Sequence, residues 1–78
     1  ASMDLYDLYH VLAVPAKVRF TFEGIPHEAE SMKEDELIAV RFDRKWYRTV
    51  DDFFKKAEID GELLTTLYEE LFDFEIVA

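Results

Sequence analysis

The chain contains no cysteine among its 78 residues. Neither a disulfide nor a thiolate zinc site can therefore stabilise the fold, so apolar packing has to do so. The lack of cysteine suits a reducing cytoplasm, which we expect as the location. No apolar run approaches the ~20 residues of a membrane span, and the first residues lack the basic cluster of a secretory signal. We expect no membrane association, and we take Met3 as the native start, with Ala1 and Ser2 as added residues.

Residues suited to catalysis are equally scarce. His10 and His27 are the only side chains whose unperturbed pKa allows proton transfer near neutral pH. They lie far apart in sequence, and no serine stands at a useful spacing from either. Acidic residues are dense over 28–36, but they lack the Asp-x-Asp-x-Asp-Gly layout of a calcium loop. The sequence therefore predicts no enzyme, no catalytic residues, no cofactor and no specific metal site.

Apolar and aromatic residues are abundant for so short a chain. Half of the residues are hydrophobic and 15% are aromatic, whereas a disordered segment would be poor in both. We therefore expect one small globular domain over residues 1–78, near the size at which a single core only just offsets chain entropy.

Charge is strongly negative and unevenly spread. The formal net charge is -9. Residues 41–56 hold six bases and three acids, a balance of +3, while the rest of the chain carries -12. Such a field repels nucleic acid and anionic membranes over most of the surface and leaves one basic patch.

The first half of the chain reads as a helix followed by strands. Apolar residues at helical spacing predict a helix over residues 4–14, with Asp4 as its cap and Pro15 as its stop. A strand over 10–14 is the alternative, because a short apolar run cannot be assigned by periodicity alone. Strict alternation over 17–23 predicts a half-buried strand.

The middle of the chain predicts a hairpin. Pro26 cannot donate to a ladder, so we expect residues 27–31 to be at best an edge strand. Ser31 and Glu34 form a capping-box pattern that predicts a short helix over 31–36. Two β-rich runs, joined by a turn at 43–44, then predict a hairpin over 37–48.

The last third predicts two helices. Thr49 can cap a helix over 50–58, because acids fill its first turn and lysines its last. Asp60 can cap a second helix over 61–72, whose Leu64, Leu67 and Leu71 recur at spacings of three and four. Residues 74–77 alternate weakly and predict a terminal strand.

These elements predict an α+β fold, because strands precede helices instead of alternating with them. We expect a small antiparallel sheet of three or four strands, packed against two or three short helices, the main ones at 50–58 and 61–72. The predicted core consists of Phe20, Phe22, Ile38, Val40, Phe42, Phe53, Leu64, Leu67, Leu71 and Phe72.

The hairpin tip is the candidate for partner binding. It combines tryptophan, tyrosine and arginine, the residues that protein interfaces concentrate. The predicted contact residues are Arg44, Lys45, Trp46, Tyr47 and Arg48. We expect a non-enzymatic regulatory module that binds another protein.

Two special cases and one alternative accompany this expectation. The acidic surface could mimic nucleic acid in the cleft of a DNA-binding protein, as small acidic modulators from phages and mobile elements often do. A strand at 74–77 left at a sheet edge could also form a homodimer. The alternative is a nucleic-acid-binding domain that uses the basic and aromatic residues of hairpin 41–48, which the surrounding negative charge disfavours.

Overall fold

The fold is based on a five-stranded antiparallel sheet, and its first strand shows the predicted alternation of buried and exposed residues. In the first strand Val18, Phe20 and Phe22 are buried, while Lys17 and Arg19 stay on the opposite face. The strands are β1 (Lys17–Phe22), β2 (Ile25–Glu34), β3 (Leu37–Phe42), β4 (Lys45–Tyr47) and β7 (Leu71–Val77). Their order is β4-β3-β2-β1-β7, so β4 and β7 form the two edges. The structure is a computed structural model that describes residues 3–77.

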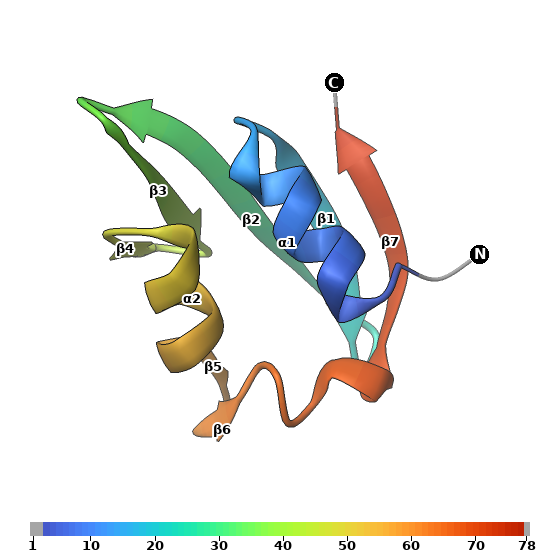
Figure 1. Cartoon of the computed structure of the whole chain (residues 1–78). Helices are drawn as coiled ribbons and strands as arrows, with labels where there is room; N and C mark the ends of the chain where they lie inside the picture. Colours follow the sequence, from blue (N-terminus) through green and yellow to red (C-terminus); the bar gives the residue numbers. More distant parts are fainter. Residues whose placement is uncertain (1–2, 78) are drawn as a thin grey trace.

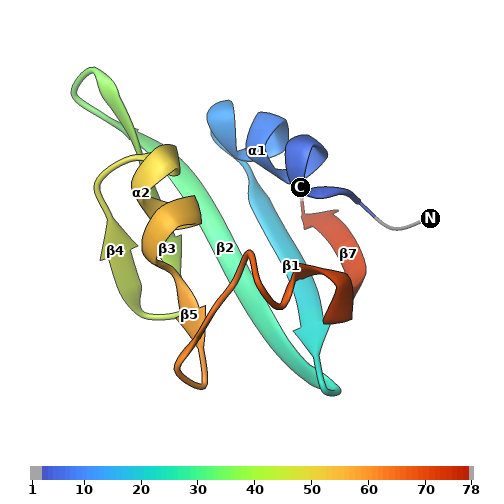
Figure 2. The same cartoon turned by 60° about the horizontal axis from the view of Figure 1, so that its bottom comes forward.

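Two helices cover one face of the sheet and leave the other open (Figures 1 and 2). Helix α1 (Leu5–Ala13) begins at Asp4, whose carboxylate accepts the N–H of Asp7 at 2.7 Å. Helix α2 (Val50–Lys56) begins at Thr49. The helix predicted over residues 4–14 is confirmed, and the alternative strand is wrong. The fold class is therefore α+β, with one strand more than the upper end of the prediction.

The capping threonine of α2 acts as predicted. The Thr49 hydroxyl accepts the N–H of Asp52 at 3.0 Å. The helix ends at Lys56, two residues before the predicted end, because Glu58 enters the short strand β5 (Glu58–Ile59).

Strand β2 corrects two predictions. Residues 27–31 are not an edge strand, because β2 pairs with β1 on one side and β3 on the other. Pro26 is tolerated because it lies opposite Thr21 but beyond the segment that pairs with β3, so its missing N–H interrupts no ladder there. The short helix over 31–36 is also wrong, since β2 continues to Glu34.

The environment of Ser31 explains why the capping-box pattern of Ser31 and Glu34 does not start a helix. It is buried at 3% exposure, and its hydroxyl accepts the N–H of Ala16 at 3.0 Å. The serine therefore joins β2 to the chain between α1 and β1, instead of capping a helix.

The predicted helix over 61–72 is wrong. In its place the chain forms β6 (Glu62–Leu63), a run of turns, a short 3-10 helix η1 (Tyr68–Glu70) and the start of β7. The cause is Asp60-Gly61, whose φ angles of 53° and 82° form a two-residue type I′ turn between β5 and β6. After β6 the chain crosses from the β4 side of the molecule to the β1 side (Figure 1).

The core lies between the sheet and this covering layer. Leu64, Leu67 and Leu71 are buried as predicted, although they do not share a helix. Ile38 is only half-buried, and Phe72 is 59% exposed, so the prediction that Phe72 belongs to the core is wrong. The predicted residues that are buried are Phe20, Phe22, Val40, Phe42, Phe53, Leu64, Leu67 and Leu71.

Candidate functional site

The hairpin of β3 and β4 presents its turn at one end of the sheet. Asp43 enters the turn at a φ of 54°. Its carboxylate lies 2.8 Å from His27 Nδ1 and accepts the N–H of Glu28 at 3.3 Å. These contacts attach the turn to β2, so the tip has a fixed position.

Side-chain alternation along β4 separates its two aromatic residues. Tyr47 points to the helix side, where it is only 6% exposed and meets the Phe53 ring edge to face at 5.7 Å. Burial raises the pKa of Tyr47, with smaller contributions from the nearby carboxylates of Glu58 and Asp43. Trp46 points to the open face and is 50% exposed. Tyr47 is therefore a core residue, and Trp46 is the aromatic side chain that another molecule can reach.

The cations of the hairpin differ from those of β1. Lys17 and Arg19 both pair with Glu28, at 3.9 and 3.1 Å. Within residues 3–77, no carboxylate oxygen lies within 4.0 Å of the charged nitrogens of Arg41, Arg44, Lys45 or Arg48, the four cations of the hairpin. Lys45 instead lies 5.6 Å from the centre of the Tyr47 ring. The four cations of the hairpin therefore form no ion pairs within the described residues, and one of them, Arg41, lies opposite Trp46 on the open face.

The open face alternates in charge across the strands. Trp46 is opposite Arg41, which is opposite Glu30, which in turn is opposite Lys17. Opposite charges on neighbouring strands attract one another. This row therefore offers little net charge except at its β4 end, where Trp46 and Arg41 lie together.

The five predicted site residues do not converge on one point. Arg44 lines a small cavity together with His27, whereas Arg48 lines a different one together with Trp46 and Asp52. The hairpin is thus a contact edge with Trp46 at its centre and lacks the closed shape of a pocket.

The two histidines lie in separate hollows. His10 lines a groove beside α1, and His27 lies by the β3–β4 turn. The acidic residues of 28–36 are spread along β2 and the turn after it. Within the described part of the chain, no three His, Cys, Asp or Glu residues are grouped so that they could hold a metal ion. Neither helix of residues 3–77 has the length and apolar content needed to cross a membrane.

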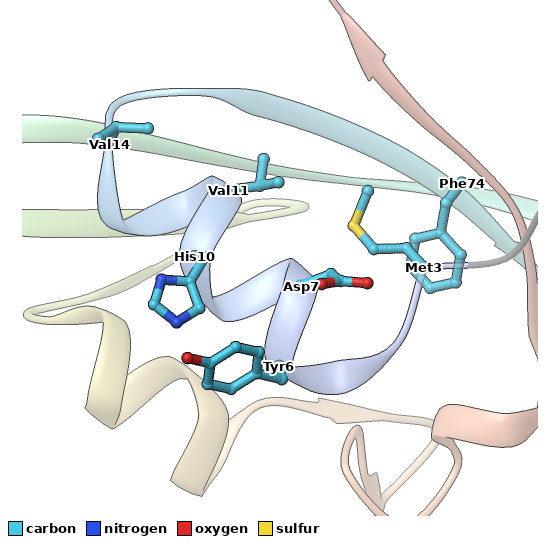
Figure 3. Close-up of a pocket in the computed structure, with 7 residues that line it drawn as sticks. All are labelled: Met3, Tyr6, Asp7, His10, Val11, Val14 and Phe74. Atoms are coloured by element: carbon cyan, nitrogen blue, oxygen red, sulfur yellow. The ribbon is translucent and has the colours of Figure 1, made fainter.

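One surface was missed by the sequence reasoning: an open groove between α1 and β7 (Figure 3). Its volume is about 790 Å³. Tyr6 and His10 meet edge to face at 4.2 Å on one flank, and Met3 and Phe74 lie at the other end. The available signal was in α1 itself, because Asp7 is the only charged residue among its nine and even its outer face is largely apolar.

Comparison with known proteins adds no relative. A scan against models of protein families, a search of curated proteins and a search of solved structures each returned no match.

Proposed function

We propose that this domain is a non-enzymatic protein-binding module that contacts its partner through the β3–β4 hairpin. The observation that carries the proposal is the half-exposed Trp46 opposite Arg41, in a hairpin whose four cations form no ion pairs within residues 3–77. An interface anchor must be reachable while its neighbours exclude water, and Trp and Arg are the commonest anchors. The partner surface accordingly carries a hydrophobic pocket for Trp46 and at least one carboxylate.

Replacing Trp46 with alanine tests this proposal. We expect the change to weaken partner binding by about 2 kcal/mol or more, which is about thirtyfold in Kd. The loss of unfolding free energy should be about 1 kcal/mol or less, because half of the side chain is already in water. The measurements are capture of partners from the source cell, calorimetry with the captured partner, and a thermal melt.

Two variants control for trivial effects. Phe72→Ala removes another exposed aromatic at the opposite edge of the sheet and should leave binding unchanged. Tyr47→Ala should instead lose about 3 to 5 kcal/mol of stability, because Tyr47 is buried. If Trp46→Ala and Phe72→Ala reduced partner capture equally, the hairpin would not be the contact site.

Mimicry of nucleic acid is a special case of this function. It requires a partner that binds DNA and a contact made by the acidic surface, where the chain outside residues 41–56 carries -12. Competition separates the two modes: added DNA should displace a partner bound through mimicry, and Trp46→Ala should leave that partner in place.

Nucleic-acid binding through the hairpin is the second candidate. The observation that favours it is the pairing of Trp46 with Arg41, since an aromatic ring and a guanidinium together can stack on a base. Glu30 beside Arg41, and the net charge of -9, oppose it. We expect no retention of labelled single-stranded DNA or RNA at physiological salt. Retention that fades as salt rises and disappears in Trp46→Ala would instead support this candidate.

A further inference from the structure

The second edge of the sheet, β7, is open along the groove below α1. Strand β7 pairs with β1 on one side, and within residues 3–77 no strand pairs with its other side. The outward backbone groups of such an edge are free to form a ladder with another chain. Edge strands commonly avoid this by being short or by carrying lysine. The other edge, β4, is three residues long and contains Lys45, whereas β7 has seven residues and no cation.

A bulge defines which part of β7 is available. Asp73, at a φ of 57°, and Phe74 together face the single residue Phe20 of β1. A bulge bends a strand and interrupts regular pairing. The regular edge is therefore the segment from Phe74 to Val77, which is adjacent to the groove.

The side chains of this segment indicate which residues an added strand should carry at alternate positions. Phe74 and Ile76 lie on the helix side of β7, and Phe74 lines the groove together with Val11 and Val14 of the α1 region. Val14 is 64% exposed and Ile76 is 56% exposed, so apolar surface is left uncovered there. An added strand would cover it with every second side chain, and these side chains should be apolar.

The charges near β7 indicate which side chains are favoured at the other positions of an added strand. Asp7 points from α1 into the groove on the helix side (Figure 3). Glu75 lies on the open face of β7, because it is opposite Arg19. Arg19 is the cross-strand neighbour of Glu75, but its guanidinium is bonded to Glu28 at 3.1 Å. Basic side chains on the open face of an added strand would therefore meet the Glu75 carboxylate, which forms no ion pair within residues 3–77.

We propose that β7 binds an extended segment of a partner protein as a sixth strand, and that this segment alternates apolar and basic residues. Its backbone pairs with residues 74–77, its apolar side chains fill the groove below α1 on the helix side, and its basic side chains lie on the opposite face, where they approach Glu75. A second copy of this chain fits less well. Pairing β7 with β7 brings Asp73 and Glu75 close to the same carboxylates of the other copy, and like charges across strands are destabilising.

The test is a titration of the isotope-labelled domain with a blocked peptide of about six alternating lysines and valines, followed by amide chemical shifts. We expect saturable changes at residues 74–77 and 10–14, with slower hydrogen exchange along the β7 edge. The glutamate and valine analogue should bind about tenfold more weakly or not at all. A lysine and valine peptide that is N-methylated on alternate residues keeps the charge but cannot form the ladder, and it should also fail.

Two charge variants make the test specific. Glu75→Lys should weaken peptide binding about tenfold, whereas Glu62→Lys makes the same change of charge in the β5–β6 hairpin and should alter binding by less than about twofold. Val14→Lys places a cation at an exposed position of the groove, where the apolar side chains of the peptide should lie, so it serves if Glu75→Lys disturbs β7.

Several outcomes would overturn the proposal. They are equal binding of the N-methylated peptide, shift changes centred on β4, and equal effects of the two charge variants. Concentration-dependent dimers with protected β7 amides would assign the edge to a second copy instead. Since β7 and the hairpin lie at opposite edges, this proposal stands or fails independently of the role of Trp46.

Discussion

At the scale of single residues, Tyr68 connects η1 to the beginning of the described chain. Its hydroxyl lies 3.0 Å from the carbonyl oxygens of Met3 and Asp4 and donates to them, which holds the entry to α1 against η1. Burial, with the nearby carboxylates of Asp4 and Asp7, raises the pKa of Tyr68 well above its usual value. The folded protein therefore retains this proton more strongly than the unfolded chain does.

The raised pKa of Tyr68 leads to a prediction about pH. Its contribution to stability is complete below the unfolded tyrosine pKa of about 10 and is lost as the pH rises above that value. In Tyr68→Phe we expect a smaller loss of unfolding free energy between pH 8 and pH 11 than in the wild type, measured by urea titration. Tyr6→Phe changes a tyrosine that is 71% exposed and should keep the wild-type slope. Identical slopes in all three proteins would contradict this role.

At the scale of elements, the Asp60-Gly61 turn sets the course of the chain from β5 to β7. Both residues have positive φ, and a Cβ added at Gly61 would meet no atom within 4 Å. Any cost of a side chain at this position is therefore a cost of backbone conformation alone.

The substitution Gly61→Ala therefore measures the effect of backbone conformation without a steric clash. Gly61→Ala should lower the unfolding free energy by about 1 to 2 kcal/mol, the cost of placing an L residue in the left-handed region. Glu62→Ala, the next residue, should stay within about 0.5 kcal/mol of the wild type. Chemical denaturation of both variants measures the difference. A neutral Gly61→Ala would mean that the turn can change its type without loss.

The same turn shows where sequence reasoning succeeded and where it could not. Alternation in β1 and the capping residues Asp4 and Thr49 are local signals, and the elements they predict are present. Asp-Gly is a hairpin signal that was available, but the spacing of Leu64, Leu67 and Leu71 outweighed it. An irregular segment can bury leucines at helical spacing as well as a helix can, because burial depends on the neighbouring surface. The exposure of Trp46 depends on which face the helices cover, so local pattern could not give it. Local pattern shows that the outer face of α1 is largely apolar, but the groove itself depends on the long-range pairing that places β7.

At the scale of the whole molecule, the two sheet edges have opposite character. The β3–β4 hairpin carries Trp46 and four cations that form no ion pairs among the described residues, and the β7 edge carries Asp73 and Glu75 beside an apolar groove. The helices and the crossing segment occupy the face between them (Figure 2). The two proposals therefore assign partners of opposite charge to the two edges of one small domain.

The pairing of β1 with β7 also sets an order of folding. Strands β1 to β4 are joined by two-residue turns and can pair locally, whereas Lys17 meets Val77 across 60 positions of sequence. We expect the amides of residues 74–77 to open and exchange hydrogen before those of the β2–β3 ladder, measured by native-state exchange. Slower exchange in β7 than in β3 would contradict this order. Until β7 arrives, the β1 edge of one chain can accept the β7 of another, so refolding at high concentration should produce domain-swapped dimers that dilution and slow refolding prevent.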